Sequence, residues 1–150
     1  MHNRPPMVSR LAAYLLGIVI ALESGRAWAT DAVPPVTLPI TASEQTIEVN
    51  ISGRKFEPPL VTLQAGRKTA LIFQNKDAEL HAFVAPDLFK GVNLNVSGNG
   101  APEFGPEGFK RVIIPSLGRA EIRFVPEHPG RYSYFCDMPG HEMKAAIVVQ

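Results

Sequence analysis

One stretch near the C-terminus concentrates side chains that bind soft or borderline metal ions. Cys136 is the only cysteine in the sequence, His141 follows five residues later, and Met143 comes two residues after that. Pro139 and Gly140 predict a tight turn that brings these side chains together. A thiolate, an imidazole and a thioether suit copper better than magnesium or calcium, which prefer oxygen ligands. With one further histidine, the set becomes two histidines, one cysteine and a weak axial methionine, which is typical of a blue-copper electron-transfer site.

The same residues also have ordinary structural interpretations. A lone cysteine is often a small buried apolar residue, and a lone histidine in a turn is often solvated. Two features favour ligation here. The three side chains lie within eight residues, and an unpaired thiol in an oxidising compartment is protected only by burial or by a metal.

The first 29 residues indicate that the chain is exported. Arg4 and Arg10 precede an apolar run of 12 residues at positions 11–22. Residues 27–29 then read Ala-Trp-Ala. This order is typical of a secretory signal peptide, so we expect residues 1–29 to be removed and the protein to be periplasmic. A membrane anchor is the alternative, but the run is shorter than the roughly 20 apolar residues that a bilayer requires. An uncleaved segment would tether the domain to the membrane.

The composition predicts one domain with many turns. The chain has 150 residues, a formal net charge of +1, 14 prolines and 12 glycines. This length fits a single domain, and the balanced charge gives no indication of nucleic-acid binding. Frequent turn residues favour an all-β fold over a helical one. We expect residues 30–45 to form an N-terminal arm or linker and residues 46–150 to form the folded domain.

Short segments with strand character follow one another through this domain. Residues 46–52 alternate cleanly, with Ile47, Val49 and Ile51 on one face, which is the pattern of a half-buried strand. Further strands are expected at residues 60–64, 69–74, 81–84, 110–114, 120–125, 131–135 and 144–149. Residues 86–108 are rich in glycine and proline and predict a long irregular connection. About eight short strands separated by turns predict a Greek-key β-sandwich.

Two sequence patterns carry a resemblance to a known family. Residues 130–141 contain Gly-x-Tyr-x-Tyr-Phe-Cys-x-x-Pro-Gly-His, and residues 75–81 contain Asn-x-Asp-x-x-x-His. A Phe-x-Pro segment at residues 56–58, followed by a strand and Ala-Gly, is also typical. Together these patterns resemble the cupredoxin superfamily of small copper proteins, over residues 46–150. The resemblance implies a cupredoxin-like sandwich that binds one copper ion in a type 1 site.

The resemblance also implies a ligand set: His81, Cys136, His141 and Met143. His81 is expected to begin a strand at one end of the sandwich, and the other three lie in a turn between two later strands. If both segments lie at the same end, rigid sheets hold the ligands, and little geometric change accompanies a change of copper oxidation state.

Two departures from the family pattern affect the details of the site. Only Glu142 separates His141 from Met143, whereas the family usually places several residues there, so Met138 is an alternative source of axial sulfur. The residue after the first histidine is Ala82, where the family often has an asparagine whose side chain connects the two ligand segments. Alanine cannot form that connection, so we expect the site to be softer than is usual in the family.

The expected function is that of a periplasmic one-electron carrier with one copper ion. No Ser-His-Asp or paired-carboxylate arrangement stands out along the sequence, so we expect no enzymatic activity. The alternatives are a copper-handling protein that stores or delivers Cu(I) without redox cycling, and a partner-binding sandwich with a vestigial site. The expected partners are redox proteins or copper-trafficking proteins, and the expected state is a monomer without a membrane span after signal cleavage. We expect electrons to pass through His141 in an exposed turn, with partners docking over Met138 and Pro139 unless Met138 folds inward.

Overall fold

Alternating apolar and polar residues generate an all-β structure in the described part of the chain. The computed structural model describes residues 43–150, so the predicted signal peptide and residues 30–42 of the predicted arm lie outside it. Eleven strands occur in this part: β1 (Gln45–Ile51), β2 (Phe56–Glu57), β3 (Leu60–Leu63), β4 (Thr69–Asn75), β5 (His81–Phe83), β6 (Leu94–Gly98), β7 (Ala101–Gly105), β8 (Gly108–Ile114), β9 (Arg119–Phe124), β10 (Gly130–Phe135) and β11 (Lys144–Val149). Residues 43–150 contain no helix long and apolar enough to cross a membrane.

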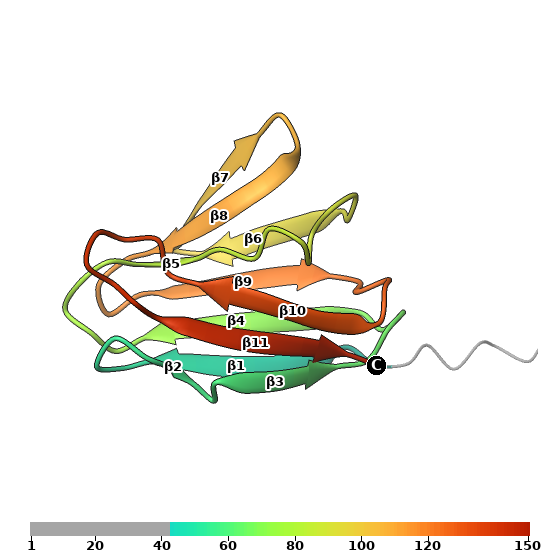
Figure 1. Ribbon diagram of the computed structural model, residues 1–150, viewed down its shortest axis with the longest axis horizontal. Helices are drawn as coiled ribbons and strands as arrows, with labels where there is room; N and C mark the ends of the chain where they lie inside the picture. Colours follow the sequence, from blue (N-terminus) through green and yellow to red (C-terminus); the bar gives the residue numbers. More distant parts are fainter. Residues whose placement is uncertain (1–42) are drawn as a thin grey trace, which may run out of the picture. The chain divides into compact units, whose positions relative to one another are not determined.

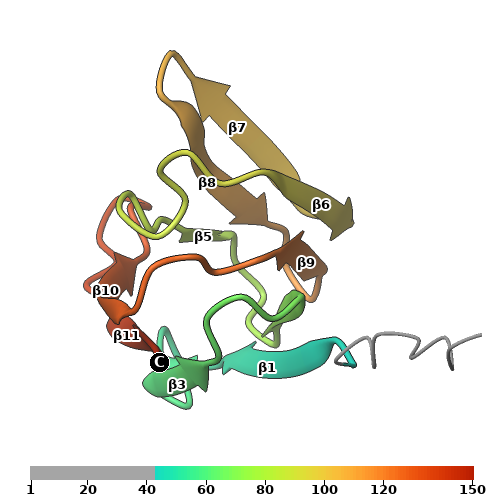
Figure 2. The ribbon, with the colours of Figure 1, turned by 90° about the vertical axis from the view of Figure 1, so that its right-hand side faces the viewer.

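The strands form two layers (Figure 1). One layer is a five-stranded sheet with the order β2-β1-β4-β9-β6. The other layer contains two three-stranded sheets, β10-β11-β3 and β5-β8-β7, which an antiparallel bridge between Val84 and Phe135 connects. Figure 2 shows β10 and β11 on the opposite side from β9. Two neighbouring pairs, β1–β4 and β3–β11, are parallel, and parallel neighbours require connections that cross between the layers. This arrangement confirms the predicted β-sandwich.

An aromatic cluster fills the space between the layers. Phe73 of β4 lies 4.4 Å from Phe83 of β5, measured between ring centroids. Tyr134 of β10 makes edge-to-face contacts with Phe83 at 5.2 Å and with Phe56 at 4.8 Å. All four side chains are at least 97% buried, with exposed fractions of 3% or less. Edge-to-face contacts of this kind add to the free energy gained by burying the rings.

The predicted strands are all present, and three further strands appear. β2 has only two residues and precedes Pro58 and Pro59, which interrupt the strand pattern in the sequence. β6 and β7 lie in residues 86–108, where an irregular connection was expected. That expectation was wrong for this segment, because β6 pairs with β9 and β7 pairs with β8 in spite of the many glycines. The β7–β8 hairpin projects away from the sandwich (Figure 1).

The segments that carry the predicted ligands meet at one end of the sandwich. The β4–β5 loop, the β1–β2 turn, the β8–β9 turn and the β10–β11 loop all lie at the left-hand end in Figure 1. Hydrogen bonds connect them: the Leu117 N–H donates to the Asp77 carbonyl at 3.1 Å, and the Gly53 N–H donates to the Asp77 carboxylate at 2.8 Å. The sandwich therefore brings together segments that are far apart in the sequence.

Candidate metal centre

The loop after β10 holds Cys136 and His141. The Cys136 N–H donates to the Met143 carbonyl at 3.2 Å, and the His141 N–H donates to the Met138 carbonyl at 3.0 Å. Gly140 has a positive φ of 78°, which glycine adopts at little cost. These bonds close the loop over Cys136 and turn the imidazole of His141 back towards it.

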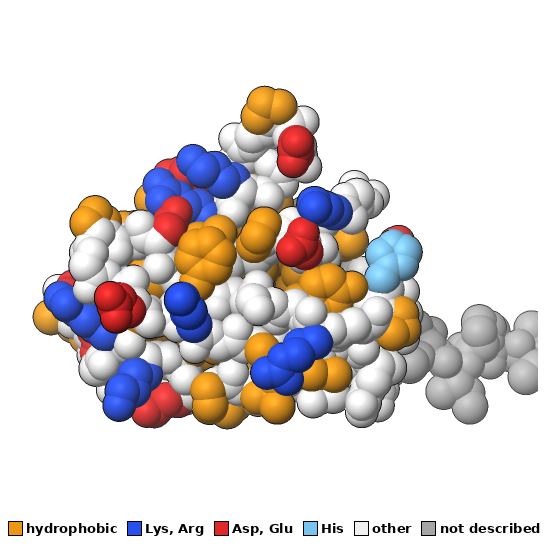
Figure 3. Space-filling model, in the orientation of Figure 1, with side chains coloured by type: hydrophobic (Ala, Val, Ile, Leu, Met, Phe, Trp, Pro, Cys, Tyr) orange, Lys and Arg blue, Asp and Glu red, His pale blue; other side chains and the backbone are white. Residues whose placement is uncertain are grey.

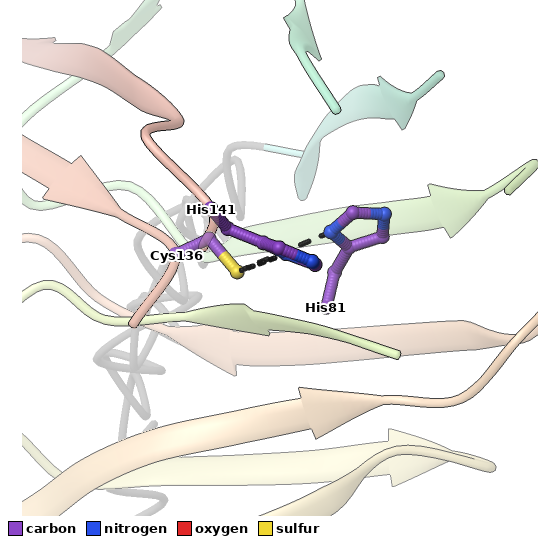
Figure 4. Close-up of side chains that lie close together, drawn as sticks. All are labelled: His81, Cys136 and His141. Carbon is purple, nitrogen blue, oxygen red and sulfur yellow. Dashed lines mark hydrogen bonds between the residues drawn. The ribbon is translucent and has the colours of Figure 1, made fainter. Parts of the chain in front are cut away.

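His81 is fully buried at the start of β5. Its exposed fraction is 0%, and β5 pairs with β8 so that His81 lies opposite Ile114. The polar β4–β5 loop delivers the chain to this position, and the sheet then fixes the backbone of the histidine. The ring points towards the β10–β11 loop (Figure 4).

The three side chains form a compact donor set. Nδ1 of His81 lies 4.0 Å from Sγ of Cys136, and Nδ1 of His141 lies 3.4 Å from the same sulfur. The donor atoms all lie within 4.8 Å of one another, and the two imidazole centroids are 4.9 Å apart. Figure 4 shows both rings directed at the sulfur. The structure thus brings together three of the four predicted ligand residues through one donor atom each.

These distances suit a first-row transition metal ion. Metal–sulfur bonds of about 2.3 Å and metal–nitrogen bonds of about 2.0 Å place the two donor atoms about 3.5 to 3.7 Å apart at trigonal or tetrahedral angles. The observed sulfur–nitrogen distances of 3.4 and 4.0 Å fall on either side of that range. A thiolate with two imidazoles is a soft to borderline donor set, which copper and zinc prefer. The residues therefore fit such an ion with small adjustments.

The sulfur also accepts a hydrogen bond from the main chain. The Ala82 N–H points at Cys136 Sγ from 3.2 Å, and Cys136 itself is 4% exposed. A donor of this kind stabilises the negative charge of a thiolate, and burial keeps water away from it. The cysteine is therefore neither an inert core residue nor an exposed thiol.

The two methionines of the loop differ in placement. Met143 is 3% exposed, and its carbonyl accepts the Cys136 N–H, so its backbone lies directly beside the cysteine. Met138 is half-buried and packs against the hydrophobic core. Of the two, Met143 is the more deeply buried and its backbone adjoins Cys136, whereas Met138 stays partly exposed. The axial role of Met143 and the docking role of Met138 both stay predictions.

His141 differs from the expectation of an exposed ring. Pro139 and Gly140 are exposed, but the side chain of His141 is only 6% exposed. The exposed turn therefore surrounds an imidazole that is itself almost covered. Glu79 contributes to this cover, since its carboxylate lies 3.6 Å from Nε2 of His141.

Asp77 occupies the equivalent position on the other imidazole. Its Oδ2 lies 2.9 Å from Nε2 of His81. A carboxylate can only accept, so Nε2 carries the proton and Nδ1 keeps a free lone pair directed at the sulfur. Burial by itself raises the pKa of Asp77, but the N–H donors of Arg54 and Gly53 and the ring of His81 lower it below its ordinary value overall.

Sequence reasoning identified Asp77 within a family pattern but did not assign it a role, and it missed Glu79 and Arg54. The guanidinium of Arg54 contacts Glu79 through two hydrogen bonds of 2.6 and 2.7 Å. The spacing of Asp77 to His81, four residues in a loop, gives a weak signal for the first contact. No local pattern connects Arg54 to Glu79, because they are 25 residues apart.

The fold and the donor set can now be compared with known proteins. The chain matches the model of the cupredoxin-like domain over residues 13–149. It belongs to the cupredoxin-like domain family. No sequence among curated proteins matches it. The resemblance inferred from residues 75–81 and 130–141 is therefore confirmed at the level of the family.

Solved structures with the same fold include cupredoxins that are distant in sequence. Auracyanin A, a "blue" copper protein from Chloroflexus aurantiacus, is 20% identical, with a TM-score of 0.54 over 72% of this chain and 100% of its own. A copper-binding protein solved by NMR in the apo form is 21% identical, with a TM-score of 0.51 over 71% of this chain and 88% of its own. Auracyanin B is 22% identical, with a TM-score of 0.50 over 71% and 88% of the two chains. At these identities the likeness shows the fold alone.

Proposed function

We propose that this cupredoxin is a periplasmic one-electron carrier that binds one copper ion in a type 1-like site. The ligands are His81, Cys136 and His141, with Met143 as a weak axial fourth. The observation that carries the proposal is the convergence of two buried Nδ1 atoms on one buried sulfur, at 4.0 and 3.4 Å. When bound, copper supplies the one-electron chemistry that no side chain of the chain provides.

The residues of the chain hold the donors in place and keep water out. His81 begins β5, and Cys136 directly follows the last residue of β10, so these two donors are anchored at sheets, while His141 lies in the β10–β11 loop. The Ala82 N–H stabilises the thiolate, and the aromatic core beneath it excludes water. A preorganised set changes little when the charge of the bound ion changes, which favours rapid electron transfer.

The burial of the ligands favours electron transfer over copper delivery. His81 is 0% exposed and Cys136 is 4% exposed, and the His141 side chain is 6% exposed. Delivery of Cu(I) requires an acceptor thiolate to reach the metal and exchange ligands. An electron needs only a short covalent path to the surface, so the covered site supports the carrier.

The remaining parts of the proposal rest on the sequence. We place the folded domain at residues 46–150, the arm or linker at 30–45 and a cleaved signal peptide at 1–29. We propose that the protein is a monomer without enzymatic activity and that its partners are redox proteins. On the face shown in Figure 3, cationic and anionic side chains are interspersed without a large area of one sign, so brief docking on a small interface suits it better than a strong charge contact.

The test is the visible spectrum of the purified domain after addition of Cu(II). The proposal predicts one equivalent of copper, an intense thiolate-to-copper charge-transfer band and reversible voltammetry, all lost in Cys136→Ser because a hydroxyl does not replace the thiolate. Bleaching to a stable Cu(I) form that passes copper to an acceptor would support copper handling instead. Absence of stoichiometric copper would leave a partner-binding sandwich with a vestigial site.

A further inference from the structure

Each imidazole of the site has a carboxylate near its outer nitrogen, hydrogen-bonded to His81 and at ion-pair distance from His141. Each directs Nδ1 at Cys136 and Nε2 at a carboxylate: Asp77 lies 2.9 Å from Nε2 of His81, and Glu79 lies 3.6 Å from Nε2 of His141. Neither carboxylate belongs to the proposed ligand set. Both come from the short loop between β4 and β5, which therefore supplies an outer contact to each histidine.

The β1–β2 turn holds both carboxylates. Gly53 and Arg54 have successive positive φ angles of 57° and 58°, and consecutive residues in this conformation direct their N–H groups into one anion-binding concavity. Those N–H groups donate to Asp77, at 2.8 Å to Oδ1 and 3.0 Å to Oδ2. The guanidinium of Arg54 meets Glu79 with two parallel bonds of 2.6 and 2.7 Å. One residue thus contacts Asp77 through its backbone and Glu79 through its side chain.

We propose that Arg54 is a positioning residue for the metal centre, because it holds the two carboxylates that orient His81 and His141. Its N–H, with that of Gly53, fixes Asp77 against Nε2 of His81. Its guanidinium fixes Glu79 over Nε2 of His141. Both Nδ1 atoms then remain directed at Cys136 before any metal arrives. This proposal rests on the three residues forming a metal site, as argued above, but it does not depend on which ion they bind.

The loop that carries the carboxylates is itself rigid. The side chain of Asn75, which is 1% exposed, accepts the Asp77 N–H at 2.9 Å and donates to the carbonyls of Glu79 and Pro115 at 2.8 and 2.9 Å. The backbone of Asp77 and Glu79 is thereby attached to the end of β8. The side chains need only the β1–β2 turn to complete their placement.

The Arg54–Glu79 ion pair should contribute little to the stability of the fold. The two side chains are 53% and 36% exposed, and ion pairs of that exposure contribute little to the free energy of unfolding. A bidentate pair nevertheless fixes the geometry of its carboxylate well. We therefore assign Arg54 the role of positioning Glu79 beside His141, rather than that of stabilising the fold.

The expected consequence for a bound metal follows from the charge of the carboxylates. Carboxylates are ordinarily anionic at neutral pH, and Arg54 holds that of Glu79 with two bonds of 2.6 and 2.7 Å. An anionic acceptor at Nε2 makes the imidazole a stronger donor. Stronger donors favour Cu(II) over Cu(I), so removing either negative charge should raise the reduction potential of the copper protein.

The first experiment uses the metal-free protein and nitrogen-15 NMR of the imidazoles at fixed neutral pH. Wild type should show His81 as one tautomer, with its Nε2–H protected from exchange. Arg54→Gly keeps both N–H donors and favours the positive φ but removes the guanidinium, so it should leave the His81 signal unchanged and increase the mobility of the His141 ring. Asp77→Asn should mix the His81 tautomers. Lys55→Ala, in the same exposed turn, is the matched control and should change neither ring.

The second experiment measures affinity with Zn(II) as the probe, in competition with a chelator. Loss of an outer contact to a ligating histidine typically weakens binding about 10–100-fold, and we expect losses in this range for Asp77→Asn, Glu79→Gln and Arg54→Gly but not for Lys55→Ala. In the copper-loaded protein, Asp77→Asn and Glu79→Gln should also raise the reduction potential. Thermal unfolding of each metal-free variant checks that it is folded.

The outcomes separate this proposal from the proposed function. Changes in ring mobility and Zn(II) affinity without a copper charge-transfer band would support Arg54 as a positioning residue and reject the copper carrier. A normal copper band with unchanged ring signals, Zn(II) affinity and potential in all three variants would overturn the role of Arg54 and leave the carrier intact. If Asp77→Asn does not fold, Arg54→Gly and Glu79→Gln decide the proposal through His141 alone.

Discussion

The main-chain N–H of Ala82 lies 3.2 Å from the sulfur of Cys136, although the two residues are 54 positions apart in the sequence. β5 carries the donor, and the acceptor is the residue that directly follows β10. The Val84 and Phe135 backbones exchange two hydrogen bonds of 3.0 Å beside it. The two ligand segments are therefore joined through the backbone, whereas the methyl group of Ala82 adds no side-chain hydrogen bond between them, so the softer site expected from this alanine stays a prediction.

Because the donor to the sulfur is a backbone group, the side chain of Ala82 should have little influence on the colour of the site. Ala82→Gly retains the N–H and should leave the energy of the charge-transfer band unchanged. It should lower the free energy of unfolding by about 0.5–1 kcal/mol, since glycine is disfavoured within a strand. Absorption spectroscopy and chemical denaturation measure the two effects.

A larger side chain at the same position provides the contrast. Ala82 is 0% exposed, so Ala82→Asn must displace its neighbours, which typically costs about 1–3 kcal/mol. A band shift in Ala82→Gly would show that the sulfur responds to the side chain rather than to the backbone donor.

The fold was predictable where local patterns are strong. Residues 46–52 and 120–125 alternate clearly, and β1 and β9 appear there. β6 and β7 were missed because their glycines and prolines conceal the alternation, and because their stability comes from pairing with β9 and β8. The parallel pairing of β1 with β4 and of β11 with β3 depends on the tertiary fold, and no local sequence pattern specifies it.

The site, like the fold, was predictable only where local sequence patterns specify it. The spacing of Cys136, His141 and Met143 and the family pattern at His81 predicted which side chains meet. The burial of the His141 ring was not predictable, because Glu79, which lies 3.6 Å from it, comes from a distant part of the sequence. Outer contacts of this kind depend on tertiary structure, and the local signals for them are weak.

The β7–β8 hairpin should contribute stability in a pH-dependent manner through Glu103. The guanidinium of Arg111 donates to both Glu103 oxygens, at 2.8 and 3.0 Å, and also to Asp137 beside Cys136 at 2.8 Å. The hydrogen bonds from Arg111 lower the pKa of Glu103 below its ordinary value of 4.5. A lowered pKa in the folded state means that the stabilisation is complete above pH 4.5 and is lost as the pH falls through the folded value.

Comparison of wild type with Glu103→Gln tests this expectation. The wild-type protein should have the larger free energy of unfolding at neutral pH, and the difference should shrink below pH 4.5. Denaturation of the metal-free proteins across this range measures it. Glu107→Gln, in the same hairpin, is the control and should show no such pH dependence. A difference that stays constant with pH would assign the effect of Glu103 to packing.

The hydroxyl group of Tyr134 should be dispensable. It is buried, and among residues 43–150 no group lies within hydrogen-bonding distance of it; burial also raises the pKa of the phenol. An unpaired buried hydroxyl costs about 1–3 kcal/mol, so Tyr134→Phe should increase the free energy of unfolding by about 1 kcal/mol. The edge-to-face contacts of the ring with Phe56, Phe73 and Phe83 remain possible in phenylalanine.

Tyr132 supplies the matched comparison for this measurement. Its hydroxyl donates to the His128 carbonyl at 2.8 Å, so Tyr132→Phe should lower the free energy of unfolding by about 0.5–1.5 kcal/mol. Opposite signs for the two variants are expected in urea denaturation. A loss of stability in Tyr134→Phe would indicate a water-mediated partner for the buried hydroxyl.

The last prediction concerns the axial sulfur. Met143 is almost fully buried, and its carbonyl accepts the Cys136 N–H, whereas Met138 is half-buried and packs against the hydrophobic core. Removing a weak thioether that favours Cu(II) should raise the reduction potential while the trigonal donors remain. Met143→Leu should therefore raise the potential and alter the charge-transfer spectrum, and Met138→Leu should leave both nearly unchanged.

Leucine and methionine have similar volumes, so each replacement should cost less than about 1.5 kcal/mol, and cyclic voltammetry of the two variants compares them at similar stability. A shift in Met138→Leu alone would assign the axial position to Met138, and no shift in either variant would leave the copper with the three donors His81, Cys136 and His141.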